Sequence, residues 1–210
     1  MSRAPAAGTI VKADTGVRRP RRRRDAEEAR REALEAARDL LLTGGPAAVT
    51  LKAVAGRIGV THVNLLHHFG SAAGLQSALM ASMVRDLTRA LVDAVTHLRS
   101  DAGAARTLID QVFDAADAGG AGRLAAWLAV SGDLQHLEPI RQAISALVAA
   151  VHEKFADEGD AALWRIRRAV LFIAIAAFGD AVIGGPLRDM LGHDDDAARD
   201  IVAGLLPSFF

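Results

Sequence analysis

The segment Thr50–Leu75, TLKAVAGRIGVTHVNLLHHFGSAAGL, holds two short helical patterns joined by a glycine turn. Thr50 can cap the first helix, because its hydroxyl can accept a hydrogen bond from an unpaired backbone N–H group. Gly59 lacks a Cβ atom and can adopt the left-handed conformation that ends a helix, which places Thr61 to cap the next one. The segment therefore predicts a helix-turn-helix, a motif that reads DNA with its second helix.

Helical periodicity separates a buried face from an exposed face in both helices. Val54 and Ile58 share one face of the first helix, and Leu65 and Phe69 share one face of the second. The residues of the second helix that are left to face a DNA groove are His62, Val63, Asn64, Leu66 and His67.

Several exposed side chains have the chemistry to contact DNA. Asn64 can form two hydrogen bonds with adenine, and Lys52 can donate to a guanine edge or a phosphate, although an ordinary surface lysine is the alternative. Val63 and Leu66 can pack on thymine methyl groups or sugars, and the histidines can donate to bases or phosphates. Thr50 and Thr61, at the two helix starts, complete the candidates in the motif.

The segment from about Arg30 to Leu75 resembles the N-terminal domain of the TetR-type repressor family. The residues that carry the resemblance are Ala36, Ala37, Leu41, Gly45, Val49, Thr50, Leu51, Val54, Ala55, Gly59, Val60, Thr61, Leu65, His68 and Phe69. The resemblance implies about nine helices, a small-molecule pocket in the C-terminal domain, and a homodimer formed by the final two helices. It also implies that His68 touches phosphate and supports the recognition helix.

Two departures from the family pattern affect contacts with DNA phosphates. Leu66 stands where the family usually has Tyr, and Ala72 and Ala73 stand where it usually has Lys followed by an acidic residue. Losing a phosphate contact weakens binding to all sequences alike and lowers its salt dependence by roughly one unit of slope.

A basic segment just upstream can supply such contacts. It comprises Arg18, Arg19, Arg21, Arg22, Arg23 and Arg24. A basic arm ahead of a helical DNA-binding domain can follow phosphates or enter the minor groove, and the alternative is a solvated, disordered tail. Asp25 and Glu28 resemble a capping box that opens the next helix. We therefore expect a disordered arm over residues 1–24.

Charge is divided between the two halves of the chain. Residues 1–99 contain 16 Lys and Arg and 9 Asp and Glu, a balance of 16 − 9 = +7, and the remaining residues have a balance of 9 − 16 = −7. Because phosphate repels the acidic half, the basic half is expected to face DNA.

The chain is expected to be all-helical, because Ala, Leu and Arg dominate and no strand-like alternation is present. We expect a helix-turn-helix domain over residues 25–72 and an effector-binding and dimerisation domain over residues 73–210. The expected helices outside the motif cover about 25–42, 73–99, 103–118, 121–131, 137–158, 160–183 and 196–206, with a break at Gly184-Gly185-Pro186.

Membrane insertion and secretion are not expected. The N-terminus lacks the apolar core of a signal peptide, and the most apolar stretch, Ala169–Phe178, is shorter than the roughly 20 residues that span a bilayer. The absence of cysteine excludes disulfides and thiolate ligands, and it is compatible with a cytoplasmic location.

The C-terminal half carries an expected association surface. The helix from Asp160 becomes apolar all round at Ala169–Phe178, so another surface must cover it, either a second copy of the chain or its own subunit. Asp194, Asp195 and Asp196 are interpreted as residues that cap and favourably charge the last helix, rather than as a cation site.

Effector and metal sites leave weaker signals. The aromatic residues Phe113, Trp127 and Phe172 are candidates for the pocket that the family resemblance implies, with ordinary core packing as the alternative. No cofactor is expected, and no metal site, because His67 and His68 point to different sides of a helix.

We therefore expect a homodimeric repressor that binds a palindromic operator in double-stranded DNA and leaves it when an unknown small molecule binds. The alternatives are an architectural DNA-binding protein without base preference and, with no nucleophile or metal motif to support it, a helical enzyme.

Overall fold

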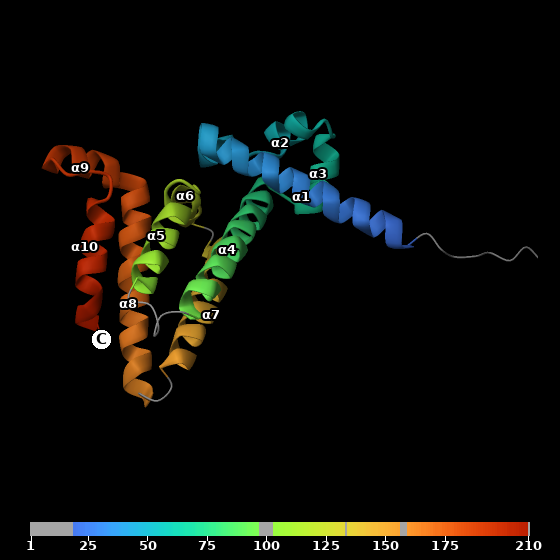
Figure 1. The fold of residues 1–210 in the computed structure, drawn as a ribbon. Coiled ribbons are helices and arrows are strands. Elements are labelled where there is room, and N and C mark those ends of the chain that lie inside the picture. The colour runs from blue at the N-terminus through green and yellow to red at the C-terminus, as the bar shows by residue number, and fades with distance from the viewer. Residues whose placement is uncertain (1–18, 97–102, 133, 156–158, 210) are drawn as a thin grey trace, which may run out of the picture.

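The computed structural model describes residues 19–96, 103–132, 134–155 and 159–209, and over these residues it is helical throughout, without strands (Figure 1). The continuous rod made of α8, the π-helical turn η4 and α9 counts as one helix, so this described part of the chain holds nine α-helical rods. The prediction of an all-helical chain with about nine helices is confirmed.

The N-terminal domain consists of three helices and the start of a fourth. They are α1 (Arg19–Gly44), a short 3-10 turn η1 (Pro46–Ala48), α2 (Leu51–Ile58), α3 (His62–Phe69) and the long α4 (Ala72–Thr96). The two helices of the predicted helix-turn-helix therefore lie where the sequence places them. Figure 1 shows α4 leading from this domain into the C-terminal one.

The C-terminal domain consists of the remainder of α4 and the helices that follow it. These are α5 (Ala104–Ala116), α6 (Ala121–Val130), η2 (Leu134–Leu137), α7 (Glu138–Lys154), α8 (Gly159–Gly179), η4 (Asp180–Gly184), α9 (Gly185–Leu191), α10 (Ala197–Leu205) and η5 (Leu206–Phe209). α4 packs mainly on α7 and α5, and α8 packs on α5, α6 and α7.

The first helix begins earlier than the sequence analysis predicts. α1 starts at Arg19 rather than at Asp25, so the backbone of Arg19–Arg24 is helical and the predicted capping box does not open the helix. Arginine is a good helix former, and Pro20 is tolerated in a first turn, where the missing N–H has no intrahelical partner. Figure 1 shows the N-terminal turns of α1 extending beyond α3.

The predicted break at Gly184-Gly185-Pro186 is not a break. The chain widens into the π turn η4 and continues directly into α9, with Pro186 in the first turn of that helix. Proline clashes with the carbonyl of the preceding turn of a regular helix, and a π turn relieves that clash without ending the helix.

Because α8, η4 and α9 form one continuous rod, its apolar part is longer than the sequence alone suggested. The rod Ala161–Leu191 is long and apolar enough to cross a membrane by length and composition, although only 11% of its most apolar window is buried within the chain. The apolar stretch Ala169–Phe178, which was expected to be shorter than a bilayer span, is therefore part of a longer apolar helix. The rod therefore presents a long apolar surface that needs a cover.

Two domains share one hydrophobic core. Buried residues of α1, α2 and α3, such as Leu41, Val54 and Leu65, pack in the same cluster as Met80 of α4 and Leu124 of α6. A movement of α4 relative to α6 would therefore change the packing of the core that supports α3.

Candidate nucleic-acid interface and internal cavity

Hydrogen bonds cap the starts of both helices of the helix-turn-helix as the sequence predicts. The Thr50 hydroxyl accepts from the backbone N–H of Ala53 at 3.2 Å, and the Thr61 hydroxyl accepts from Asn64 N–H at 3.2 Å. Gly59 ends α2 with a φ of 71°. The caps and the glycine turn are thus confirmed, and they set the angle between α2 and α3 locally.

The outer face of α3 is open to solvent. Leu65 and Phe69 are buried, as predicted, whereas Val63 is 71% and Leu66 41% exposed. The other exposed side chains of the helix are His62, Asn64 and His67, and His68 is half-buried. Thr50 and Lys52 are exposed at the start of α2. The structure therefore brings the candidate contacts of α2 and α3 to solvent, with hydrogen-bonding and apolar side chains side by side on α3.

Arg30 of α1 holds the far end of α3, which the sequence analysis did not identify. Its Nη1 donates to the His68 carbonyl oxygen at 3.0 Å, and its guanidinium lies 4.7 Å from the centre of the Phe69 ring. A cation at a helix C-terminus satisfies a carbonyl that has no intrahelical partner and complements the helix dipole. A separation of 38 residues in sequence leaves no local pattern from which to find this contact.

Gln76 is the buried polar residue of this region. It is 8% exposed, and its Nε2 donates to the Val49 carbonyl oxygen at 3.1 Å and to the Pro46 carbonyl oxygen at 3.4 Å. The side chain thereby ties α4 to the connection between α1 and α2.

Most of the predicted arginine arm lies outside the described residues. Arg18 is outside the described residues, and so are the side chains of Arg19, Arg21, Arg22, Arg23 and Arg24. The helical backbone nevertheless sets their reach, because a rise of 1.5 Å per residue carries residues 19–24 about 9 to 16 Å beyond Arg30 along the axis of α1.

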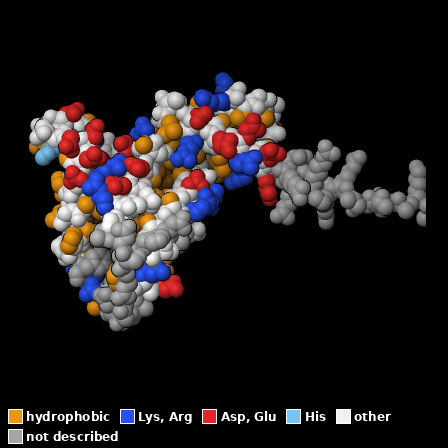
Figure 2. Space-filling view, in the orientation of Figure 1, with side chains coloured by type: hydrophobic (Ala, Val, Ile, Leu, Met, Phe, Trp, Pro, Cys, Tyr) orange, Lys and Arg blue, Asp and Glu red, His pale blue; other side chains and the backbone are white. Residues whose placement is uncertain are grey.

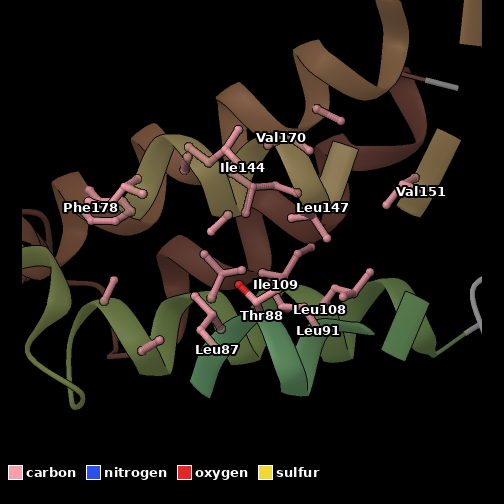
Figure 3. A pocket seen from close by; sticks show the side chains of 18 of the residues that line it. Leu87, Thr88, Leu91, Leu108, Ile109, Ile144, Leu147, Val151, Val170 and Phe178 are labelled. Atoms are coloured by element: carbon pink, nitrogen blue, oxygen red, sulfur yellow. The ribbon is translucent and has the colours of Figure 1, made fainter. Parts of the chain in front are cut away.

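A cavity of about 600 Å³ lies inside the C-terminal domain, between α4, α5, α7 and α8 (Figure 3). Its walls are almost entirely apolar, with aliphatic side chains such as Leu87, Ile109 and Leu147 and the two rings of Phe155 and Phe178. Figure 3 shows the labelled side chains of α4 and α5 pointing toward those of α7 and α8, with the Thr88 hydroxyl among them.

The three aromatic candidates lie elsewhere and do not line this cavity. Phe113 is fully buried in a separate core cluster, beneath the Arg199 guanidinium at 5.6 Å. Phe172 packs on Phe209 with ring centres 5.4 Å apart, and Trp127 is 45% exposed on α6. Two other aromatic residues, Phe155 and Phe178, do line the cavity, and nothing in the local sequence distinguishes them from the three candidates.

Arg106 lies at the edge of the cavity, within a cluster of charged side chains. Its Nε donates to the Asp110 carboxylate at 2.9 and 3.0 Å, and its Nη1 donates to Asp200 of α10 at 2.7 Å. The hydrogen bonds that Arg106 donates to Asp200 and Asp110 raise its pKa. Arg199 adds an ion pair to Asp114 at 2.7 Å. Figure 2 shows acidic and basic side chains interleaved in this part of the surface.

The last helix is not capped as predicted. Asp196 occupies the N-cap position of α10 but makes no side-chain capping hydrogen bond. Its carboxylate lies 3.9 Å from Nε of Arg199, and Asp195 lies 3.6 Å from Nη2 of Arg188. These aspartates are exposed, as expected, but they pair with arginines instead. Among the residues whose positions are described, no group of three or more His, Cys, Asp or Glu is placed to hold a metal ion.

An apolar stripe runs along the outside of the α8–η4–α9 rod and onto α10. Trp164, Leu171, Ile175 and Val182 recur at intervals of 7, 4 and 7 residues, which places them on one helical face. The remaining exposed apolar side chains of this surface are Ile183, Leu187, Met190, Leu191, Ile201 and Leu205. We call these ten residues the apolar stripe.

Known proteins resemble this chain in its N-terminal segment and in its fold. Residues 33–79 match the family model of the bacterial regulatory proteins, tetR family. The crystal structure of a TetR-family transcriptional regulator from Pectobacterium atrosepticum is similar over 90% of this chain and 95% of that chain, with a TM-score of 0.64 and 19% identity. A ketosteroid transcriptional regulator, KstR2, of Mycobacterium tuberculosis covers 86% of this chain and 92% of its own at a TM-score of 0.47 and 19% identity. No curated protein matches in sequence. The resemblance to the TetR-type family is thus confirmed in the N-terminal segment and in the fold.

Proposed function

We propose that this chain, which has the fold of a TetR-family transcriptional regulator, is a repressor that binds a palindromic operator as a homodimer and releases it when a small molecule enters its cavity. The observation that carries the proposal is the exposed face of α3, held at one end by the Thr61 cap and at the other by Arg30. A recognition helix needs such fixed ends, because base contacts require the side chains to be held in one register.

Direct reading of bases falls to α3. Asn64 carries the amide that pairs with adenine, and Val63 and Leu66 supply apolar contacts beside it. Lys52 at the start of α2, His68 and the arginines that begin α1 supply phosphate contacts. The backbone of these arginines is helical from Arg19 onward. They would therefore contact the DNA phosphates beside the operator from a rigid helix rather than from a flexible arm.

Dimerisation supplies the second half-site. The apolar stripe is long and exposed in one chain, and a second copy placed on it by a two-fold axis would cover it with an identical stripe. A two-fold axis would also set two α3 helices to read half-sites about 34–36 Å apart. Insertion of the rod into a membrane would separate α8 from α5, α6 and α7, on which it packs, whereas a dimer covers the stripe and keeps those contacts.

Release by a small molecule is supported by the position of the cavity. Met80, Met83 and Ala121 line the cavity and also belong to the core that supports α3. A molecule that separates α4 from α6 at this end would shift Gln76, one turn away on α4, and with it the start of α2. Such a molecule weakens DNA binding only to the extent that it prefers the shifted conformation.

Two other functions predict different experimental results. An architectural protein would bind through phosphates with little base preference. A helical enzyme would convert the molecule in the cavity, although the cavity lining presents no nucleophile paired with a base among its described residues.

The experiment is selection and sequencing of genomic DNA fragments retained by the purified protein at physiological salt, with Asn64→Ala and Ser145→Ala in parallel. We expect a two-fold symmetric site, with Asn64→Ala relaxing one position in each half-site by about 1–3 kcal/mol. Ser145 lies on α7, away from α3, and its variant should leave the preference unchanged. Retention without base preference would favour the architectural function, and turnover of a cavity-bound molecule would favour the enzyme.

A further inference from the structure

The shape of the cavity restricts the molecule that fills it. Its lining on α4 runs from Met80 to Leu91, a rise of about 16 Å at 1.5 Å per residue. A volume of about 600 Å³ spread over that length gives a mean width of about 7 Å. The lining on α8 also runs for about 18 Å, from Ile166 to Phe178, so a space of this volume that follows both helices suits an extended molecule better than a compact one.

The charges at the cavity exclude an ionised ligand. Arg106 is the charged residue of the lining, and it is already bound by the carboxylates of Asp110 and Asp200. A ligand anion that approached Arg106 would meet the two carboxylates that already occupy its guanidinium, and the nearby Arg199 is itself paired with Asp114 at 2.7 Å and lies 3.9 Å from Asp110. A ligand cation would find no carboxylate in the described lining, and burying a charge without a partner is costly.

One polar group in the wall can still recognise a ligand. The Thr88 hydroxyl donates to the Val84 carbonyl oxygen at 2.8 Å, which uses its hydrogen and leaves its oxygen able to accept. A ligand hydroxyl that donates to this oxygen would be matched, whereas a ligand that offers only acceptors would not.

From these observations we propose that the cavity binds an elongated, uncharged, hydrocarbon-rich alcohol, with the ligand hydroxyl donating to Thr88 and the hydrocarbon lying along α4. This inference rests on the proposed function in taking the cavity molecule as the effector. The effector class is thereby a neutral lipid-like alcohol rather than a carboxylic acid, an amine or a phosphate ester.

The first test compares three probes with the same chain. Calorimetric titration of the full chain, without DNA and below the solubility limit of each probe, measures binding of 1-dodecanol, dodecanoate and dodecylammonium. We expect 1-dodecanol to bind at least about tenfold more tightly than either ion, because each ion must bury an unmatched charge. Equal or tighter binding of either ion, or no binding of 1-dodecanol, would overturn the proposal.

Matched variants locate the probe. Thr88→Val should lower the affinity for 1-dodecanol about fivefold, the effect of one neutral hydrogen bond, whereas Thr107→Val removes an exposed hydroxyl of α5 outside the lining and should change nothing. Ala143→Phe on α7 fills the cavity and should lower the affinity at least tenfold. Ala146→Phe, one turn along the same helix and outside the lining, should not. Equal effects within either pair would overturn the assignment.

The acidic partners of Arg106 provide a separate test. Asp200→Asn removes one of the two carboxylates, so the affinity for dodecanoate should rise severalfold while that for 1-dodecanol stays constant. An unchanged ratio would show that these charges do not select the ligand. Failure of the proposed function is distinguishable, because it appears as a lack of symmetric-site retention by the ligand-free protein, whatever the outcome of the titrations.

Discussion

The side-chain amide of Gln76, in the second turn of α4, donates a hydrogen bond to the backbone carbonyl of Val49, 3.1 Å away, just before α2 begins. Val49 is itself fully buried and leads directly to the Thr50 cap. The start of the helix-turn-helix is therefore attached to α4, the helix whose next turns line the cavity. This contact is a short physical connection between the cavity and the DNA-facing surface.

Replacing Gln76 by Leu should destabilise the protein by about 1–3 kcal/mol, because the Val49 and Pro46 carbonyls would lose a buried donor. Chemical denaturation measures the change. Gln142→Leu is the control, since Gln142 donates to Glu138 on the exposed surface of α7. If both variants lost the same stability, the buried contact would have no special role. In the DNA selection, we also expect Gln76→Leu to weaken binding more than its stability loss explains.

Removing the Arg30 side chain should loosen the end of the recognition helix. Arg30→Ala loses the hydrogen bond to the His68 carbonyl and the contact with the Phe69 ring, together about 1–2 kcal/mol. Arg31→Ala, on the same helix, loses only exposed ion pairs to Glu28 and Glu35 and should cost less than about 0.5 kcal/mol. Thermal unfolding ranks the two variants, and the reverse order would contradict the role of Arg30.

A charge in the apolar stripe should prevent self-association. Ile175 is 65% exposed in one chain and lies midway along the stripe, so Ile175→Glu should convert a dimer into monomers in sedimentation velocity experiments. Val130→Glu, at a residue of α6 that is 89% exposed and outside the stripe, should leave the dimer intact. A wild-type chain that sediments as a monomer would refute the proposed interface.

The π turn η4 is held by an ion pair that leaves no room for a side chain at Gly184. A Cβ atom there would fall on the Asp180 carboxylate and within 2.8 Å of Nη1 of Arg188. Gly184→Ala should therefore destabilise the fold by about 1–3 kcal/mol, because the Asp180 side chain must move away from Arg188. Gly56 of α2 faces open space, so Gly56→Ala should stabilise the chain by about 0.5–1 kcal/mol. Denaturant unfolding of both variants tests the opposite signs.

The start of α7 should respond to acid over a defined range. Hydrogen bonds from Arg141, with an Nε to Oε2 distance of 2.7 Å, and from Gln142 lower the pKa of Glu138 from 4.5 to about 2. Because the folded pKa is lowered, the stabilisation is complete above pH 4.5 and is lost as the pH falls from 4.5 toward 2. NMR titration of the Glu138 carboxyl should give a midpoint near 2 in the wild type. Arg141→Ala should move the midpoint toward 4.5, and an unmoved midpoint would exclude Arg141 as the cause.

Local chemistry made much of the DNA-facing motif predictable. Thr50, Gly59 and Thr61 act on backbone groups within a few residues of themselves, so their caps and turn follow from the order of residues alone. Gly184 shows where such reasoning fails. A glycine before a proline usually ends a helix. Here the helix continues through the π turn, where Asp180 and Arg188 form an ion pair across the turn.

The order of residues thus determined by itself that this chain is helical, where α2 and α3 begin and end, and which side chains of α3 face outward, because caps, glycines and helical periodicity act over one or two turns. Tertiary structure alone decided that Arg30 holds the end of α3, that Gln76 joins α4 to Val49, and that Phe155 and Phe178 line the cavity among aliphatic side chains while Phe113, Trp127 and Phe172 do not. Those contacts join residues far apart in the sequence, and they arise from how whole helices pack, which no local pattern encodes.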